Sequence, residues 1–286
     1  MGLTHFKLCY FEPRVRITAL CSAHAGIRPV GYSYDGESHD FWECVFILKG
    51  RAGITAGETV YTLTEGQMIF HPPGEFHRLW NDGDGFLRIV IVTFAADRFP
   101  IDEHRVYLFE PDDRIHSICK DIRKQFDTDG IFLIGLKDEK RAGAAQKAIS
   151  SLENMFLELF EQYSDVPAEN IKKDRFSELY SSAVAIMKRN LGVRLTASEI
   201  SNECGMSVST MQKLFYRYTG MGMMKYYEGV RMQHAQTLLD NGYMVKEVAF
   251  ALGYEDQNYF STAYKRYFGA PPQKAAPAKK GEKTKK

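Results

Sequence analysis

Two sets of residues in the first third of the chain combine turn residues with side chains that can bind a ligand. The first reads G-x5-E-x-H-x3-E-x6-G from Gly31 to Gly50, and the second reads G-x5-P-x-G-x2-H-x3-N from Gly66 to Asn81. Inward-facing imidazole and carboxylate groups can donate and accept hydrogen bonds, which suits a small polar ligand. The residues that could supply this chemistry are Glu37, His39, Glu43 and His77.

The segment around these residues has the composition of a β-rich domain. Between residues 1 and 108, runs such as FWECVFILKG, ETVYTL, QMIFH and FLRIVIVTF are rich in β-branched and aromatic residues, which favour strands. AG, EG, PPG and NDGDG separate these runs, and such residues are typical of turns. Many short strands at close spacing predict an all-β barrel or sandwich.

With this spacing, Gly31 to Asn81 resembles the two motifs of the cupin barrel. The resemblance implies a jelly-roll barrel in which metal-binding cupins hold an ion at the matching positions. The sequence departs from that pattern at Glu37, where metal-binding cupins usually have a histidine. If a metal is bound here, the resemblance implies that its ligands are Glu37, His39, Glu43 and His77, a mixed nitrogen and oxygen set that suits Mn, Fe, Zn or Ni.

The second half of the chain contains an internal repeat. One copy runs from Thr196 to Gly220 and the other from Val245 to Gly269, with one extra residue after the internal glycine of the second copy. The matched pairs are Ile200 with Val248, Ser201 with Ala249, Gly205 with Gly253, Met211 with Phe260, and Phe215 with Tyr264. Each copy reads as two helices joined by a tight turn, so the repeat predicts two helix-turn-helix units.

Both copies carry local signals for the ends of helices. Thr196 and Glu199 have the spacing of a capping box, and Ser207 and Asp256 stand where a side-chain oxygen caps the second helix of each unit. We expect residues 223–240 to form a helix that connects the units. Such a helix spans about 27 Å at ~1.5 Å per residue, which would let the two second helices enter successive major grooves about 34 Å apart.

Residues 195–273 resemble the DNA-binding domain of the AraC family of bacterial transcription regulators. The resemblance rests on the first helix-turn-helix, on RMQHAQTLL from Arg231, on V-x-x-V-A-x-x-x-G-Y from Val245 to Tyr254, and on the closing YFGAPPQ. Ser201 departs from the alanine that is usual in the family. The resemblance implies a cytoplasmic, sequence-specific regulator of transcription that binds double-stranded DNA at promoters.

In this family the outward face of each second helix contacts DNA. The resemblance implies base contacts from Ser209, Gln212, Lys213, Gln257, Asn258, Ser261 and Thr262. Gln and Asn pair with adenine edges and Lys with guanine. The expected phosphate contacts, which position the protein without reading sequence, are Arg217, Lys265 and Arg266. The second unit has no Arg or Lys among its base-reading positions, so we expect it to contribute less selectivity.

For the barrel, the AraC resemblance implies an effector site. Sensor barrels of this family usually lack a metal, so we expect no metal, no cofactor and no catalytic residue. The residues expected to bind a small polar effector are His39, Trp42, Glu43 and His77. Two alternatives stay open, a metal-dependent cupin enzyme fused to a DNA-binding domain and an architectural protein that binds DNA without sequence preference.

A change of periodicity after residue 108 predicts helices. Ile115, Ile118 and Ile122 lie on one helical face, and after a loop near residues 127–130 a longer helix carries a wide apolar stripe from Ile149 to Tyr163. The stripe could pack on the barrel or on a partner helix in a homodimer. The predicted organisation is therefore a sensor barrel at 1–108, a helical region with a role in dimerisation at 109–164, a linker at 165–175, a helix-turn-helix domain at 176–273 and a disordered basic tail at 274–286.

The charge distribution separates the two halves. Residues 1–174 carry 20 Lys and Arg against 27 Asp and Glu, a net charge of −7, and residues 175–286 carry 17 against 9, a net charge of +8. Only the second half therefore suits a polyanion such as DNA. The five scattered cysteines predict neither disulfides nor a zinc site, and no apolar run predicts a secretory signal or a membrane partner. An activator of this kind would also contact RNA polymerase.

Overall fold

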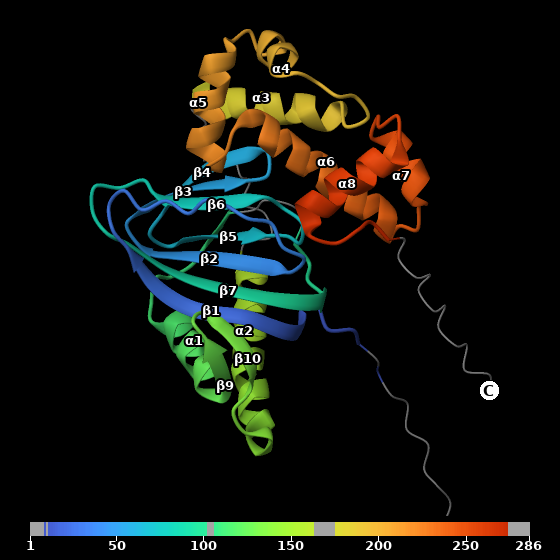
Figure 1. The fold of residues 1–286 in the computed structure, drawn as a ribbon. Coiled ribbons are helices and arrows are strands. Elements are labelled where there is room, and N and C mark those ends of the chain that lie inside the picture. Colours follow the sequence, from blue (N-terminus) through green and yellow to red (C-terminus); the bar gives the residue numbers. More distant parts are fainter. Residues whose placement is uncertain (1–8, 10, 102–105, 163–174, 274–286) are drawn as a thin grey trace, which may run out of the picture. The chain divides into compact units, whose positions relative to one another are not determined.

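The computed structural model describes residue 9 and residues 11–101, 106–162 and 175–273 (Figure 1). The chain divides into two compact units, a β-rich one within residues 1–172 and a helical one at residues 173–286, to which the short segments Tyr34–Gly36 and Gly57–Val60 are also assigned. The predicted fold class, a cupin-like domain with appended helices and a separate all-helical domain, is confirmed. Within the described residues, no helix has both the length and the apolar character that a membrane span needs.

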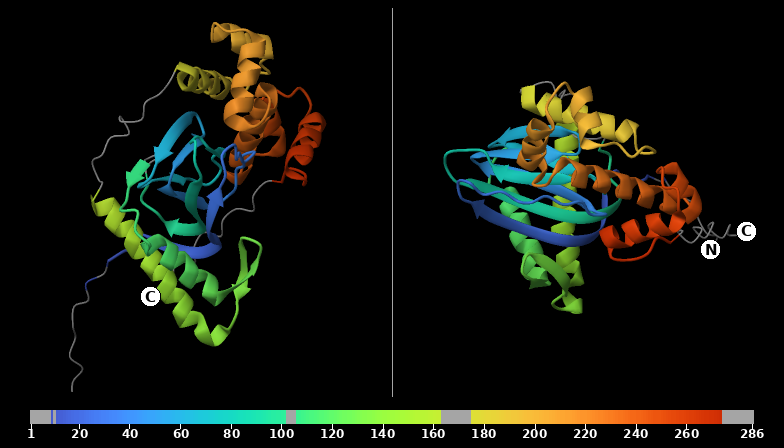
Figure 2. Two further views of the ribbon diagram at one scale, coloured as in Figure 1. Left: turned by 90° about the vertical axis from the view of Figure 1, so that its left-hand side faces the viewer. Right: turned by 45° about the horizontal axis from the view of Figure 1, so that its top comes forward.

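The β-rich unit contains two sheets. The larger has the strand order β8-β5-β2-β7-β1-β10-β9 and the smaller has the order β4-β3-β6; Figures 1 and 2 show the smaller sheet lying over the larger one. The strands are β1 (Arg16–Arg28), β2 (Trp42–Lys49), β3 (Arg51–Ala56), β4 (Thr59–Thr64), β5 (Gln67–His71), β6 (His77–Asn81), β7 (Leu87–Arg98), β8 (Val106–Leu108), β9 (Phe126–Asp129) and β10 (Phe132–Leu136).

Strand β2 is apolar along almost its whole length because both of its faces are buried. Val45 and Ile47 belong to the core between the sheets, whereas Cys44 and Phe46 belong to a second core on the other side of the larger sheet. Successive side chains of a strand point to opposite faces, and both faces of β2 are covered. Glu43 follows the same alternation and shares the inner face with Val45.

Helices α1 (Arg114–Gln125) and α2 (Ala142–Gln162) cover the outer face of the larger sheet (Figure 1), and the 3-10 helix Glu139–Arg141 precedes α2. The apolar stripe of α2 is buried in the core on the outer face of the larger sheet. The Phe156 ring lies 5.2 Å from the Phe70 ring and 5.6 Å from the Phe94 ring, centroid to centroid. The width of the stripe is therefore accounted for by packing on the sheet, without a partner helix. Tyr163, its last predicted member, lies outside the described residues.

The segment between α1 and α2 differs from the sequence prediction. The sequence predicts a loop near residues 127–130 inside a helical region, but β9 and β10 form a hairpin that extends the larger sheet. It joins β1 through the pair Ser22 and Phe132. The polar tip of the hairpin supplies the turn signal, whereas the pairing to β1 is a long-range contact that no local pattern reveals.

The helical unit contains six described helices. They are α3 (Arg175–Arg189), α4 (Ala197–Glu203), α5 (Val208–Thr219), α6 (Met223–Asp240), α7 (Val245–Ala251) and α8 (Gln257–Phe268). Helix α6 has the bounds predicted for the connecting helix, and α3 begins at the last residue of the predicted linker. The rest of that linker and the predicted basic tail lie outside the described residues.

The two helix-turn-helix units, α4–α5 and α7–α8, bury the residues that the repeat paired. Ile200, Met211, Val248 and Phe260 are all fully buried. Thr196 and Glu199 form the capping box, and the Ser207 and Asp256 side chains cap α5 and α8. The glycines of both turns have positive φ, 65° at Gly205 and 70° at Gly253, which glycine adopts without a Cβ penalty.

Arg231 on α6 is a buried charge in the centre of the helical unit. Its guanidinium donates hydrogen bonds to the carbonyl oxygens of Leu191 and Leu252. Its Cζ lies 4.9 Å from the centre of the Tyr254 ring and 5.7 Å from that of Tyr227, within the range of cation–π attraction. Arg231, the first residue of the RMQHAQTLL stretch, therefore ties the second turn and the segment after α3 to the connecting helix.

Candidate DNA interface and barrel site

The outward faces of α5 and α8 carry two matching stripes. Ser209, Lys213 and Arg217 are exposed and four residues apart, so they lie along one side of α5. The counterparts of these residues in the second unit are Asn258, Thr262 and Arg266, each 49 positions later, and all three are exposed on α8. The structure thus presents equivalent polar surfaces on both second helices, as a repeated reader of DNA requires.

Gln212 does not belong to the exposed stripe of α5. Its side chain is half-buried, and its Oε1 accepts a hydrogen bond of 3.1 Å from the backbone N–H of Met223. Met223 is the first residue of α6, and the N-cap Gly222 has no side chain to satisfy that helix end. The geometry therefore gives Gln212 a capping task. Its repeat counterpart Ser261 is half-buried as well.

The remaining predicted DNA contacts are exposed but differ in their partners. Gln257 and Lys265 are exposed, Thr262 Oγ1 donates to the Asn258 carbonyl at 2.9 Å, and Arg266 forms an ion pair of 2.6 Å with Glu228 on α6. Sequence reasoning missed Tyr216, whose side chain is 58% exposed on α5 beside Arg217. The repeat could have pointed to Tyr216, because its counterpart in the second unit is Lys265, one of the predicted phosphate contacts.

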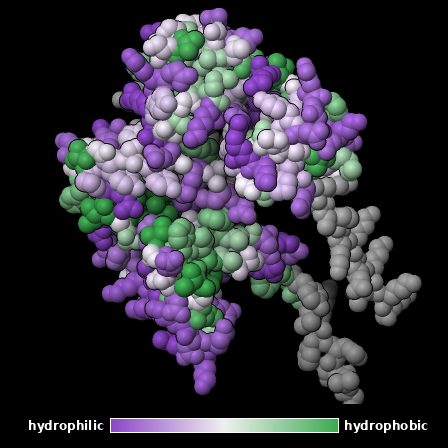
Figure 3. Space-filling view, in the orientation of Figure 1, coloured by the Kyte–Doolittle hydropathy of each residue, from purple (hydrophilic) through white to green (hydrophobic). Residues whose placement is uncertain are grey.

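Much of the positive charge of the second half lies outside the described helices. Residues 175–273 carry 11 Lys and Arg against 8 Asp and Glu, a net charge of +3, of the +8 carried by residues 175–286. On the face drawn in Figure 3 the helical unit has a mostly hydrophilic surface with scattered hydrophobic side chains. The described helical unit is only mildly basic, so its attraction for DNA depends on the positions of its Lys and Arg side chains. Lys213, Arg217, Lys265 and Arg266 all lie on the two second helices.

In the barrel, the four residues of the two motifs converge. Glu43 lies on β2 and His77 on β6, while Glu37 bridges to His77 through two backbone hydrogen bonds of 2.9 Å. One ligand atom from each of Glu37, His39, Glu43 and His77 lies within 4.8 Å of the others. The structure brings together all four residues that the cupin resemblance picked out.

Backbone carbonyls fix the orientation of both histidines. His39 Nδ1 lies 2.9 Å from the Phe41 carbonyl and His77 Nδ1 lies 3.0 Å from the Glu75 carbonyl. A carbonyl only accepts, so each Nδ1 carries the proton and each Nε2 is directed to Glu43, at 3.7 Å and 3.6 Å. Both Nε2 atoms are buried without a hydrogen-bond partner among the described residues. This is the arrangement of histidines prepared for a ligand at Nε2.

The protonation states in the barrel follow from burial and mutual charge. Burial and the neighbouring His71 lower the pKa of His77 to about 4. Burial opposes the ionised form of Glu43, yet His77 and His39 hold the pKa of its carboxyl below the usual value. For His39, burial is outweighed by Glu43 and Glu37, which raise its pKa. At neutral pH the site therefore presents a neutral His77 beside an ionised Glu43.

Sequence reasoning missed one member of this cluster and misplaced another residue. The buried His71 ring stacks on His77 with centroids 4.5 Å apart, and its Nδ1 lies 2.8 Å from a carboxylate oxygen of Glu75. The signal was the alternation of β5, which places His71 on the inner face with Ile69. Trp42, expected to bind the effector, is on the opposite face from Glu43 and packs against Phe99 at 4.9 Å. The structure therefore does not bring Trp42 to the site.

Comparison with known families matches both units. Residues 200–276 match the helix-turn-helix domain family and residues 27–93 match the cupin domain family. The chain is therefore a DNA-binding regulator that joins a cupin domain to a helix-turn-helix domain. In these two parts it resembles the AraC type of transcription regulators, and the curated relatives reported below are named as transcription regulators.

Curated relatives cover most of the chain. It is 24% identical over 248 residues to the HTH-type transcriptional activator RhaR of Enterobacter sp. (strain 638), covering 82% of this chain and 84% of that protein. It is 32% identical over 90 residues to the Msm operon regulatory protein of Streptococcus mutans, covering 31% and 32%. The match to the crystal structure of ToxT from Vibrio cholerae O395 covers 88% of this chain and 95% of that chain, with 12% identity and a TM-score of 0.34.

Proposed function

We propose that this regulator reads promoter DNA with the exposed stripes of α5 and α8 and responds to a small polar effector in its barrel. The observation that carries the DNA part is the equivalence of the two stripes, Ser209, Lys213 and Arg217 against Asn258, Thr262 and Arg266, at a constant offset of 49 positions. In this assignment Lys213 reads a base, and Arg217, Lys265 and Arg266 bind phosphates.

The DNA assignment predicts different effects for two cations on one helix. Lys213→Ala should weaken binding to the specific site by ~1–3 kcal/mol and relax the preference at one base pair. Arg217→Ala should weaken binding to all sequences alike and lower the salt dependence by about one phosphate contact. Titrations of specific and random duplexes at several salt concentrations measure both. Equal changes in specificity for the two variants would contradict the assignment.

The base-contact role of Gln212 is weakened by its hydrogen bond to Met223. Gln212→Glu keeps an acceptor for the Met223 N–H but removes the amide donor that pairs with adenine. If Gln212 contacts a base, this variant loses specificity. If the variant keeps both its DNA specificity and its stability, Gln212 caps α6 and does not contact a base.

For the barrel, we propose that His39, Glu43 and His77 bind the effector. Two buried Nε2 atoms without partners among the described residues and an ionised carboxylate favour a polar molecule. An apolar occupant would leave these groups unpaired, at about 1–3 kcal/mol each. In a reporter assay, His39→Ala or His77→Ala should abolish the effector response and leave basal DNA affinity intact. A normal response in both variants would locate the effector elsewhere.

A divalent metal ion at the same residues is a second candidate. The observation that favours it is the fixed Nδ1–H of both histidines, which leaves two Nε2 lone pairs facing the Glu43 carboxylate. Glu37, His39, Glu43 and His77 would hold the ion, whose role would be to bind an oxygen of the effector. Metal analysis of the purified protein tests this, with Glu43→Gln expected to lower the bound metal and Glu58→Gln, a carboxylate elsewhere, expected to leave it unchanged.

The proposal extends to the assembly and the macromolecular partners of the regulator. We propose a cytoplasmic homodimer that binds promoter DNA and, as an activator, contacts RNA polymerase. The stripe of α2 packs on the sheet, so it does not support self-association. Sedimentation of the full chain tests the homodimer, and a monomer at micromolar concentration would overturn it.

A further inference from the structure

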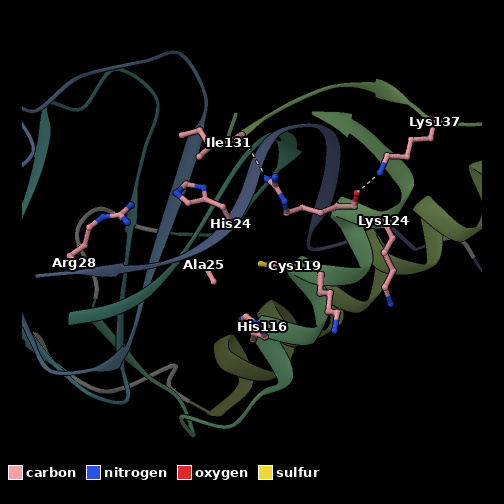
Figure 4. Close-up of a pocket in the computed structure, with 10 residues that line it drawn as sticks. His24, Ala25, Arg28, His116, Cys119, Lys124, Ile131 and Lys137 are labelled. Carbon is pink, nitrogen blue, oxygen red and sulfur yellow. Dashed lines mark hydrogen bonds between the residues drawn. The ribbon is translucent and has the colours of Figure 1, made fainter. Parts of the chain in front are cut away.

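A second cleft in the β-rich unit is lined by cations. It lies beside β1, α1 and the tip of the β9–β10 hairpin, and has a volume of about 610 Å3 (Figure 4). The described residues that line it include no Asp or Glu. Its positively charged side chains are those of Arg28, Lys120, Arg123, Lys124 and Lys137, and two histidines, His24 and His116, complete its polar lining.

The spacing of these residues on their elements explains why they meet. His24 and Arg28 are four apart on β1 and share one side of the strand, and Figure 4 shows the Arg28 guanidinium directed toward His24. On α1, His116, Lys120 and Arg123 are four and three apart, which places them on one helical face. Gathering cations in this way, within the half of the chain (residues 1–174) whose net charge is −7, costs mutual repulsion that a bound anion would relieve.

Three nitrogen atoms in this cleft are buried without a partner. His24 Nδ1, Arg28 Nε and His116 Nδ1 make no hydrogen bond among the described residues. Buried polar groups are normally paired, so three orphans around one cavity indicate a missing partner with several acceptor atoms. Burial and the charge of Arg28 lower the pKa of His24, as expected where positive charge is concentrated.

Other contacts hold the walls of the cleft in place. Arg123 donates to the carbonyl oxygens of Gly130 and Ile131 at 3.2 Å and 3.3 Å, and so fixes the hairpin tip to α1. Lys124 is paired with Asp121 at 2.8 Å, so it is partly neutralised. The Arg28 guanidinium lies so close to Gly26 that a Cβ built on Gly26 would clash with it. Arg28 Nη1 donates a long hydrogen bond of 3.5 Å to the Ile27 carbonyl oxygen, and its Cζ lies 5.0 Å from the centre of the Tyr32 ring. Its Nε has no partner among the described residues and Lys120 is exposed, so these are the two cations that we expect to contact a ligand.

We propose that this cleft is a binding site for a small organic polyanion, separate from the Glu37–His77 cluster. The Arg28 fork matches the oxygens of a phosphoryl or carboxylate group, and a cavity of this volume suits a metabolite. Ala25, Cys119 and Ile131 supply apolar contacts for its carbon skeleton. The shared chemistry is two or more clustered oxyanions, as in a sugar bisphosphate or a tricarboxylate.

The test is calorimetric titration of the full chain with fructose 1,6-bisphosphate, citrate and inorganic phosphate at constant ionic strength. We expect at least one organic anion to bind with a Kd below about 1 mM. Binding should weaken at least about tenfold in Arg28→Gln and in Lys120→Gln. Lys120 is exposed, so its replacement does not threaten folding. Binding of the bisphosphate alone or of citrate alone identifies the kind of oxyanion, and either result supports the site.

Two matched variants separate a site from general charge screening. Lys147→Gln removes one exposed cation of the same unit, on α2 away from the cleft, and should leave the Kd unchanged. Gly26→Ala keeps every charge but displaces the Arg28 guanidinium, and should weaken binding several-fold. No binding of any of the three anions, or equal losses in Lys120→Gln and Lys147→Gln, would overturn the proposal.

Discussion

The two units bury charged side chains in opposite ways. Arg231 in the helical unit is only 6% exposed, and its guanidinium is hydrogen-bonded to two carbonyl oxygens and flanked by two aromatic rings. In the barrel, Glu43 and His77 are equally buried, but the Nε2-to-carboxylate distances are 3.6 Å to 4.0 Å. Neither histidine Nε2 has a hydrogen-bond partner among the described residues. The charge of Arg231 therefore has hydrogen-bond and ring partners in its own unit, whereas the two histidine Nε2 atoms of the barrel have no partner among the described residues.

This difference distinguishes a buried charge that stabilises the fold from a buried cluster that can bind a ligand. A buried charge that is hydrogen-bonded and flanked by aromatic rings within its own unit contributes to the stability of that unit. A buried cluster whose atoms face each other just beyond hydrogen-bond distance costs free energy until something occupies the gap. Loss of Arg231 should therefore cost stability, whereas changes in the barrel cluster should mainly alter its response to pH and ligands.

The largest effect is expected from Arg231→Met. The variant leaves two buried carbonyl oxygens without their donor and removes two cation–π contacts, so the helical unit should lose about 3 kcal/mol of stability. Circular dichroism at a helix-sensitive wavelength during denaturation detects the loss. Fluorescence of Trp42 and Trp80, the two tryptophans of the chain and both in the β-rich unit, should keep its midpoint.

A matched control is Arg189→Met. Arg189 is an exposed arginine of the same unit, and its ion pair with Glu203 at 3.4 Å is on the surface, where such pairs contribute about 0.5 kcal/mol. Equal losses in the two variants would mean that the contacts of Arg231 do not stabilise the helical unit.

The next effect is a pH dependence confined to the barrel. The pKa of His77 is about 4 in the folded chain and about 6.5 when unfolded, so between these values the unfolded chain binds the proton first. Barrel stability should therefore be full above about pH 6.5 and fall as the pH drops to about 4. The lowered pKa of Glu43 acts in the same direction, and the raised pKa of His39 opposes it.

The lowered pKa of His77 alone corresponds to about 3.4 kcal/mol, at about 1.4 kcal/mol for a difference of one in pKa. Because the raised pKa of His39 opposes it, we expect the barrel to lose about 2 kcal/mol of stability over this pH range. Denaturation followed by tryptophan fluorescence at several pH values measures the loss, and His77→Gln should remove most of the dependence. Barrel stability that is constant or rises on acidification would show that His77 is not buried in its neutral form.

The sequence predicted the parts of the molecule that depend on local patterns. Both helix-turn-helix units, their caps and the bounds of α6 follow from short spacings, and the four converging barrel residues follow from the cupin resemblance. The structure does not bring Trp42 to the barrel cluster, and the prediction for Gln212 left out its capping contact. The alternation of β2 places Trp42 on the face opposite Glu43, against Phe99. For Gln212 a contact outside the local pattern, the open end of α6, decides the orientation.

Longer-range contacts account for the other misses. Strand β10 joins the larger sheet only by meeting β1, more than a hundred residues earlier, and its run IFLIGL has no alternation that would indicate a half-buried strand. The stripe of α2 predicted an apolar contact correctly but could not distinguish the sheet from a partner helix. The cationic cleft escaped prediction because its members come from β1, α1 and the hairpin, and no motif links them.

The smallest effect comes from the repeat position where the two units differ in polarity inside the core. Ser201 and Ala249 are both fully buried, and Ser201 Oγ has no hydrogen-bond partner among the described residues. An unpaired buried hydroxyl costs about 1–3 kcal/mol, and alanine removes it while leaving only a small void. Ser201→Ala should therefore stabilise the helical unit by about 1 kcal/mol.

Ser207→Ala serves as the opposite control, because it removes the cap on the Thr210 N–H at 3.2 Å and should cost about 1 kcal/mol. Circular dichroism measures both variants. If Ser201→Ala is also destabilising, the hydroxyl has a partner in solution, and the first unit is as fully satisfied as the site around Arg231.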